Sequence, residues 1–284
     1  MRAPRVLALV CATAALTDGA RVARPSPSHG MCARRQLLDA AALAALAPVF
    51  AAAPAARANG LILFPPEALQ NRYFLLRAGE TVAEAAGKIE TNPIATLGPS
   101  SFLTPKGVGQ VEAAAAAMVA AGLEGGTGCW VYYNKASPSQ QTAAVLGRVL
   151  GVSYSNIVPD FAWLDPRGVG ALEGQQLPLL DELRKMDSSD PSLRPPPAED
   201  GTPNESIGDL LVRVRNIVSI LETSYQGVDV VLVSPSSDVL SVLAAASLGD
   251  DLRNHAKYAL GPAEFRVIEL ARRGESRTEM RPGP

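Results

Sequence analysis

Short apolar runs alternate with longer amphipathic segments along most of this chain. The apolar runs are rich in Val, Ile, Tyr and Phe, which favours strands, and they cover residues 73–76, 129–133, 157–164, 228–234 and 265–270. Apolar residues recur at helical spacing in segments between these runs, at 105–122, 138–150, 206–225 and 239–248. Strands that alternate with helices predict an α/β fold, with a mainly parallel sheet and helices on both of its faces.

Polar residues and glycines mark the expected ends of these helices. An N-cap side chain accepts a hydrogen bond from the first turn, and the residues placed for this role are Thr104, Ser137, Asn204 and one of Ser236 and Ser237. Gly151 is expected to end the second helix. Residues 78–102 show little periodicity and residues 187–203 hold five Pro, so both segments are expected to be loops.

Charged residues follow several predicted strands directly. Arg77, Lys135 and Asp165 with Arg167 come after the first three strands, and Asp238 comes shortly after the fourth. In a parallel sheet, ligands bind beyond the carboxyl ends of the strands. We therefore expect these side chains to converge on one pocket.

The segment after the first strand reads Arg77-Ala78-Gly79-Glu80-Thr81. It resembles the Arg-His-Gly-Glu-Thr signature of the histidine phosphatase superfamily, the phosphoglycerate-mutase-like proteins. Further segments resemble motifs of that family and come in the family's order: 103–107 with Gln110, 141–143, 170–174, Glu205-Ser206 with Arg213, and 230–234. This resemblance covers roughly residues 71–270 and implies the three-layer phosphoglycerate-mutase-like fold.

The resemblance also locates the family's catalytic groups. The family uses a His that takes up the phosphoryl group, two Arg and a second His that neutralise the phosphoryl oxygens, and a carboxylate acid. The positions are carried over one at a time. Arg77 occupies the position of the first Arg, and Ala78 that of the nucleophilic His. Pro occupies the other three: Pro138 stands for the second Arg, Pro166 for the acid and Pro235 for the second His. The resemblance thus implies a site in which four of the five groups are missing.

Histidine content supports the same interpretation. The chain holds two His, His29 and His255, and His29 lies in a segment that we interpret below as a targeting sequence. The rest of the chain therefore cannot supply a site with two His. His255 stands beside Asn254 and Lys257 and is expected at the surface or at a helix end.

Two alternatives remain for the basic residues of the pocket. In one, Arg77, Lys135 and Arg167 bind an anion such as phosphate or a sugar phosphate. In the other, a carboxylate within the protein neutralises Arg77, the choices being Glu80, Asp165 and Asp238. Asp165 is the candidate acid if the site is catalytic. No cofactor is expected, and no metal site either, since Asp165 and Asp238 are too few ligands.

The first 58 residues differ from the rest of the chain: they hold seven Arg, no Lys and two acidic residues. Residues 1–16 resemble an ER signal peptide, and residues 20–35 resemble a plastid transit segment. Arg34-Arg35 then precedes a second apolar run that ends in Ala56-Arg57-Ala58, as in a twin-arginine export signal. These serial signals predict a presequence, 1–58, and a thylakoid-lumen domain, 59–284. The alternatives are a bacterial export signal and a low-complexity tail.

Loss of this presequence changes the charge of the chain. Residues 59–284 hold 19 basic and 26 acidic residues, a net charge near −7, which disfavours nucleic acid as a partner. No apolar run in this part is expected to span a membrane. Cys129 is its one Cys, so no internal disulfide can form and a buried thiol is expected.

Three functions stay open at this point. The first is a non-catalytic phosphoglycerate-mutase-like protein of the thylakoid lumen, a binding or assembly module whose partner is an anionic small molecule or a lumen protein. The second is an active phosphatase or mutase-type enzyme on small phosphorylated metabolites, with Arg77 and a carboxylate such as Asp165 in a rewritten site. The third is a purely structural protein with a closed pocket.

Overall fold

A computed structural model describes residues 61–269 and 281–282 of the chain, all within one compact unit, Arg57–Pro284. The expected presequence, 1–58, lies outside the described residues. A six-stranded sheet runs through the unit in the order β3-β2-β4-β1-β5-β6. Its strands are β1 Arg72–Arg77, β2 Cys129–Asn134, β3 Ile157–Asp160, β4 Asp229–Ser234, β5 Phe265–Ile268 and β6 Arg281–Pro282.

The first four strands are parallel and the last two are antiparallel to their neighbours. β1 pairs with β4 from Arg72 opposite Asp229 to Arg77 opposite Ser234, so both strands end at the same edge of the sheet. β2 pairs in parallel with β3 and β4, whereas β5 runs antiparallel to β1 and β6 antiparallel to β5. The predicted mainly parallel sheet is confirmed.

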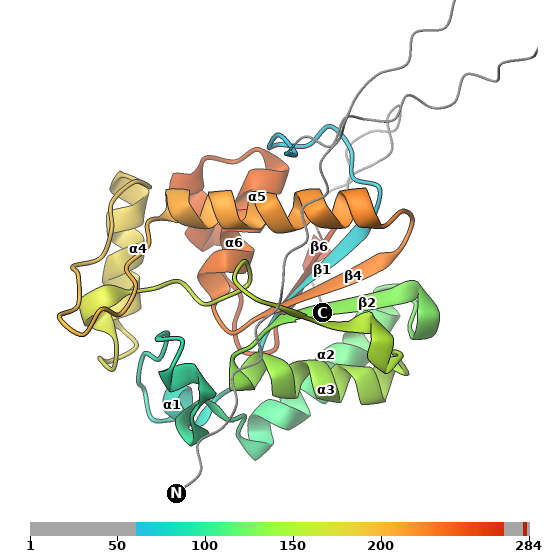
Figure 1. Ribbon diagram of the computed structural model, residues 1–284, viewed down its shortest axis with the longest axis horizontal. Coiled ribbons are helices and arrows are strands. Elements are labelled where there is room, and N and C mark those ends of the chain that lie inside the picture. Colours follow the sequence, from blue (N-terminus) through green and yellow to red (C-terminus); the bar gives the residue numbers. More distant parts are fainter. Residues whose placement is uncertain (1–60, 270–280, 283–284) are drawn as a thin grey trace, which may run out of the picture. The chain divides into compact units, whose positions relative to one another are not determined.

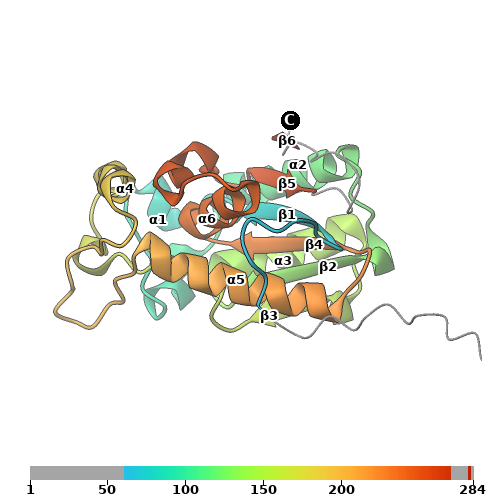
Figure 2. The same cartoon turned by 90° about the horizontal axis from the view of Figure 1, so that it is seen from above.

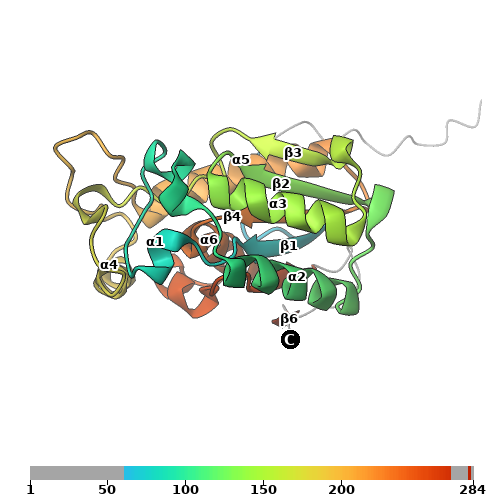
Figure 3. The ribbon, with the colours of Figure 1, turned by 90° about the horizontal axis from the view of Figure 1, so that it is seen from below.

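Helices cover both faces of this sheet, as predicted (Figure 1). The helices of the described residues are α1 Val82–Ala85, α2 Pro105–Ala120, α3 Ser137–Leu150, α4 Leu179–Ser189, α5 Ile207–Ser224 and α6 Ser237–Leu248. Figure 2 shows α5 and α6 over one face of the sheet, and Figure 3 shows α2 and α3 over the other. Among the described residues, no helix has the length and apolar content needed to span a membrane.

Alternation along β1 explains how one strand serves two cores. Tyr73 and Leu75 pack into the core beneath α5 and α6, and Phe74 and Leu76 pack into the core beneath α2 and α3. Successive side chains of a strand point to opposite faces, so a short run that is apolar throughout belongs in a sheet covered on both sides. Cys129 is buried in the second core, as expected, and burial raises the pKa of its thiol to about 12.

The helix ends bear out some of the predicted caps and overturn two. Thr104 accepts a hydrogen bond from the Gly107 amide at 2.9 Å, Ser236 caps α6, and Gly151 ends α3 with a left-handed φ of 64°. The prediction for Ser137 was wrong, because its hydroxyl donates to the Leu97 carbonyl and α3 begins without a side-chain cap.

Asn204 was also a wrong choice of cap. Its side chain donates to the Pro195 carbonyl, and Ser206 caps α5 in a reciprocal arrangement with Asp209. Two helices, α1 and α4, were not predicted from the sequence. The predicted 78–102 loop contains α1 and two 3-10 turns, Ala95–Leu97 and Pro99–Ser101. The predicted proline-rich loop, 187–203, begins later than expected because α4 extends to Ser189.

Candidate functional site

The loop that follows β1 is held by close packing against the start of α2. A Cβ added to Gly79 would lie 2.5 Å from the Gly107 carbonyl oxygen, and one added to Gly107 would lie 2.3 Å from the Glu80 carbonyl oxygen. Only glycine allows such an approach at both positions. The glycines of the first two motifs thus fix the path of the chain beside Ala78.

Other motif residues hold the same loop by hydrogen bonds to its backbone. Gln110 accepts from the Glu80 amide at 3.1 Å, Thr142 from the Gly79 amide at 3.3 Å, and Gln141 from the Leu103 amide at 2.7 Å. Glu173 similarly accepts from the backbone and the hydroxyl of Thr91. Four of the motif residues that this chain retains therefore support backbone structure.

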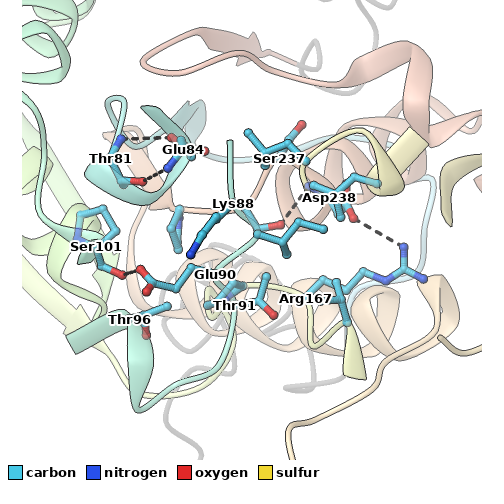
Figure 4. Close-up of a pocket in the computed structure, with 18 of the residues that line it drawn as sticks. Thr81, Glu84, Lys88, Glu90, Thr91, Thr96, Ser101, Arg167, Ser237 and Asp238 are labelled. Carbon is cyan, nitrogen blue, oxygen red and sulfur yellow. Dashed lines mark hydrogen bonds and ion pairs between the residues drawn. The ribbon is translucent and has the colours of Figure 1, made fainter. Parts of the chain in front are cut away.

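A cavity of about 70 Å³ opens at the carboxyl ends of β1 and β4. Arg77, Pro138, Pro166 and Pro235 all line it, so positions that lie far apart in the sequence meet here as the family resemblance implies. Figure 4 shows Thr81, Glu90 and Ser101 on one side of this pocket and Arg167, Ser237 and Asp238 on the other. Glu84, Lys88 and Arg184 also contribute charged groups to its lining.

Ala78 follows β1 but is not among the residues that line this cavity. Its amide donates to the Ser234 carbonyl at 2.9 Å, its carbonyl accepts from the Ala263 amide at 3.0 Å, and its methyl group is buried. Two hydrogen bonds therefore hold the backbone of Ala78 in place. The side chain offers no atom that reacts with a phosphoryl group.

Arg77 is neutralised by Glu84, a partner outside the three carboxylates considered from the sequence. One terminal nitrogen of the guanidinium pairs with Glu84, the other donates to the Leu260 carbonyl at 3.1 Å, and Nε donates to the Pro235 carbonyl at 3.4 Å. Glu80 instead pairs with Lys106 at 2.7 Å, away from Arg77. All three nitrogens of Arg77 therefore have partners within the protein.

Glu84 lies where it does because it closes the first turn of α1. Its carboxylate accepts from the Thr81 amide at 3.1 Å while the Thr81 hydroxyl accepts from the Glu84 amide at 3.1 Å, which is a capping box. The spacing of Thr81 and Glu84 in the sequence is the signal that could have located this helix start. The contact with Arg77 follows only once the turn has formed.

Arg167 is fully buried in an ion pair with Asp187 of α4. Its two terminal nitrogens lie 2.6 and 2.8 Å from the two Asp187 oxygens, and one of them lies 3.5 Å from Asp238. Burial by itself lowers the pKa of Arg167, but the hydrogen bond with Asp187 and the nearby charges outweigh it, so the pKa rises. Burial likewise raises the pKa of Asp238, yet Arg167 and Arg184 lower it more, and the carboxyl stays ionised.

His255 is fully buried in the last turn of a 3-10 helix, so the predicted helix-end position is confirmed and the surface alternative was wrong. It lies in the 3-10 helix Leu252–Tyr258, which packs against α6 and α4. Nδ1 lies 3.0 Å from the Leu252 carbonyl, and Nε2 lies 3.7 Å from an Asp187 oxygen. His255 is not among the residues that line the cavity, and its Nε2 lies near the buried ion pair of Arg167 and Asp187.

The remaining candidates lie beyond β2 and β3, outside the cavity lining. The Lys135 ammonium sits 3.9 Å from the centre of the Phe161 ring, and Asp165 accepts from the Asn134 amide group at 3.3 Å. Burial raises the pKa of Asp165. The structure therefore brings Arg77 and Arg167 to one cavity but leaves Lys135 and Asp165 apart from it. Within residues 61–269 and 281–282, no group of three or more His, Cys, Asp or Glu is placed to hold a metal ion.

Comparison with known families accounts for this arrangement. The family model for the histidine phosphatase superfamily (branch 1) matches residues 73–281. The chain belongs to this superfamily. The resemblance read from its motifs and the expected phosphoglycerate-mutase-like fold are thereby confirmed. No curated protein matches the chain significantly.

Solved structures of superfamily members share the fold at low sequence identity. A mycobacterial glucosyl-3-phosphoglycerate phosphatase in complex with VO3 is 22% identical, with a TM-score of 0.55 over 70% of this chain and 92% of that one. A phosphoserine phosphatase variant from Entamoeba histolytica, bound to phosphoserine, is 18% identical, with a TM-score of 0.53 over 74% and 96%. At such identities the likeness establishes the fold, and the substrates are those of the named proteins.

Proposed function

We propose that this chain is a non-catalytic member of the superfamily and acts as a binding or assembly module. The observation that carries the proposal is the content of the cavity at the ends of β1 and β4. Pro138, Pro166 and Pro235 line it at the positions where the resemblance places an Arg, an acid and a His. Ala78 stands at the nucleophile position. None of these four side chains can accept a phosphoryl group, transfer a proton or neutralise a developing charge.

The expected loss of rate is large because several groups are missing together. Removing one acid–base group or one charge-stabilising donor typically costs about 10²–10⁴-fold in rate. Effects of groups that act as a unit do not simply multiply, but the loss of a nucleophile alone removes the covalent route. We therefore expect no phosphorylated intermediate and no mutase activity.

Phosphatase assays on residues 59–284 test this proposal, since that fragment contains every described element. Turnover of p-nitrophenyl phosphate and labelling by a phosphoryl donor are both expected to be absent. Arg77→Ala is the matched variant for any residual signal. Turnover in the wild type that is lost in Arg77→Ala would favour the enzyme alternative, whereas a signal equal in both proteins comes from a contaminant.

Anion binding at Arg77 is a separate part of the proposal. A phosphate would have to compete with Glu84, whose carboxylate already takes the charge-assisted bond of the guanidinium. We expect inorganic phosphate to bind the wild type with a Kd of about 1 mM or weaker, and roughly tenfold more tightly in Glu84→Gln. Gln keeps an acceptor for the Thr81 amide, so the helix start is retained.

Calorimetry with inorganic phosphate measures both affinities. Glu80→Gln is the control, because Glu80 pairs with Lys106 and its loss removes one negative charge without freeing Arg77. Equal affinities in the Glu84 and Glu80 variants would show that Arg77 is not the anion site. The structural interpretation with a closed pocket would then replace ligand binding.

We also propose that the mature protein resides in the thylakoid lumen of a plastid. The serial arrangement of apolar and Arg-rich segments before Asn59 supports this location. N-terminal sequencing is expected to find Asn59 as the first residue. Arg34→Lys with Arg35→Lys should block entry into the lumen, and Arg21→Lys with Arg24→Lys, a second pair in the same presequence, should leave it intact.

A further inference from the structure

Most charged side chains that line the cavity are paired within the protein. The pairs are Arg77 with Glu84, Arg167 with Asp187 and Asp238, and Arg184 with Asp181 and Asp238. Two charged residues of the lining, Lys88 and Glu90, form no ion pair with any described residue. Glu90 accepts hydrogen bonds from the hydroxyls of Ser100 and Ser101, which are neutral donors. Within the described part of the chain, the lining therefore holds one unpaired charge of each sign.

Lys88 and Glu90 come from one short stretch whose backbone is anchored between them. The Ile89 amide donates to the Gln175 carbonyl at 2.8 Å, and the Ile89 carbonyl accepts from the Gly174 amide at 2.9 Å. Ile89 itself is buried. Figure 4 shows the side chains of Lys88 and Glu90 at the pocket. Two opposite charges are thus presented to the cavity from fixed, neighbouring positions without neutralising each other.

This pair of charges selects a class of ligand. A simple ion of either sign would gain one attraction and meet one repulsion, because an anion at Lys88 would lie near the Glu90 carboxylate and a cation at Glu90 near the Lys88 ammonium. A molecule that carries a carboxylate and an ammonium on one carbon can place each group beside the opposite charge. α-Amino acids have this arrangement.

The size and the walls of the cavity narrow the class further. A volume of about 70 Å³ has room for about five to seven water-sized groups, which is the size of glycine, alanine or serine. Val169, Leu177 and Leu180 also line the cavity, and such apolar walls suit a short aliphatic side chain. A larger amino acid would have to displace part of this wall.

We propose that the cavity binds a small zwitterionic α-amino acid, with its carboxylate at Lys88 and its ammonium at Glu90. This inference rests on the proposed function, since it treats the cavity as a binding site, and it names the class of ligand. It requires neither release of Arg77 from Glu84 nor any catalytic group.

NMR titration of isotope-labelled residues 59–284 with alanine tests the proposal. Ethylamine lacks the carboxylate and propionate lacks the ammonium, although both keep a short apolar body. Each should bind the wild type at least about tenfold more weakly than alanine. Equal affinity for alanine and either analogue would overturn the proposal.

Two single variants should change the ligand preference in opposite directions. Glu90→Gln removes the negative charge and keeps an acceptor for one serine hydroxyl, so it should weaken alanine at least about tenfold and strengthen propionate. Lys88→Met removes the positive charge and keeps the alkyl stem, so it should weaken alanine similarly and strengthen ethylamine. Glu112→Gln is the matched control, since Glu112 pairs with Arg148 and is not in the cavity lining.

Circular dichroism melting curves verify that each variant is folded, and the three ligands on the wild type decide the matter if one is not. No alanine binding to the wild type, or an equal loss in Glu112→Gln, would overturn this inference and leave the absence of catalysis untouched. Turnover of p-nitrophenyl phosphate that depends on Arg77 would instead overturn the proposed function. The two failures are therefore distinguishable.

Discussion

The buried pair of Arg167 and Asp187 offers the sharpest test of how the pocket wall is built. Both side chains are 0% exposed, and two hydrogen bonds of 2.6 and 2.8 Å join them. Removing one partner of such a pair leaves an uncompensated buried charge, which typically costs about 3–5 kcal/mol of unfolding free energy. Replacing both partners with apolar residues of similar volume is often close to neutral.

The surroundings of the pair predict an asymmetry between the two single variants. Arg167→Met leaves Asp187 without its arginine, leaves Asp238 with Arg184 alone at 3.9 Å, and removes the bond from Nε to the Glu205 carbonyl, so its cost should lie near 5 kcal/mol. Asp187→Leu leaves Arg167 with Asp238 at 3.5 Å, so its cost should lie near 3 kcal/mol. The double variant should lie within about 2 kcal/mol of the wild type.

Urea unfolding of residues 59–284, followed by the fluorescence of Trp130 and Trp163 and by circular dichroism, measures these differences. Coincident transitions from the two probes are needed before unfolding free energies are compared. Arg167→Lys keeps the charge without the planar fork and should cost less than Arg167→Met, which covers the case in which the Met variant fails to fold. Additive single costs, or single costs below about 1 kcal/mol, would refute the reasoning.

Three further outcomes are expected. Ala78→His with Pro235→His should remain inactive toward p-nitrophenyl phosphate, because two other catalytic positions still hold Pro; turnover above the wild type would contradict this. Burial raises the pKa of Asp165, so ionisation of this carboxyl lowers folding stability as the pH rises from the ordinary carboxyl range through the raised pKa. The melting temperature of Asp165→Asn should therefore exceed that of the wild type at pH 7 but not at pH 4. Ser206→Ala should lower the unfolding free energy by about 1 kcal/mol in urea titrations, since Ser206 caps α5, and no change would mean that water replaces the cap.

Local pattern was enough to predict the framework of this protein. The apolar runs at β1, β2 and β4 and the helical spacing of α2, α3 and α5 are properties of neighbouring residues, and their alternation allows few topologies. The motif order also predicted that Arg77, Pro138, Pro166 and Pro235 would meet, which they do in the cavity lining. The shared edge of the parallel strands brings Arg77, Arg167 and Asp238 to the cavity, but Lys135 and Asp165, expected there on the same ground, lie outside its lining.

The partners of the charged side chains were decided by tertiary structure alone. Glu80 and Glu84 are both close to Arg77 in the sequence, but the first turn of α1 directs Glu84 toward the guanidinium while Glu80 pairs with Lys106. Arg is a residue type that usually lies at the surface, and Arg167 is buried because α4 brings Asp187 against it. Which charges meet depends on how loops fold over the sheet, and that is set by packing among segments far apart in the chain, which local periodicity does not record.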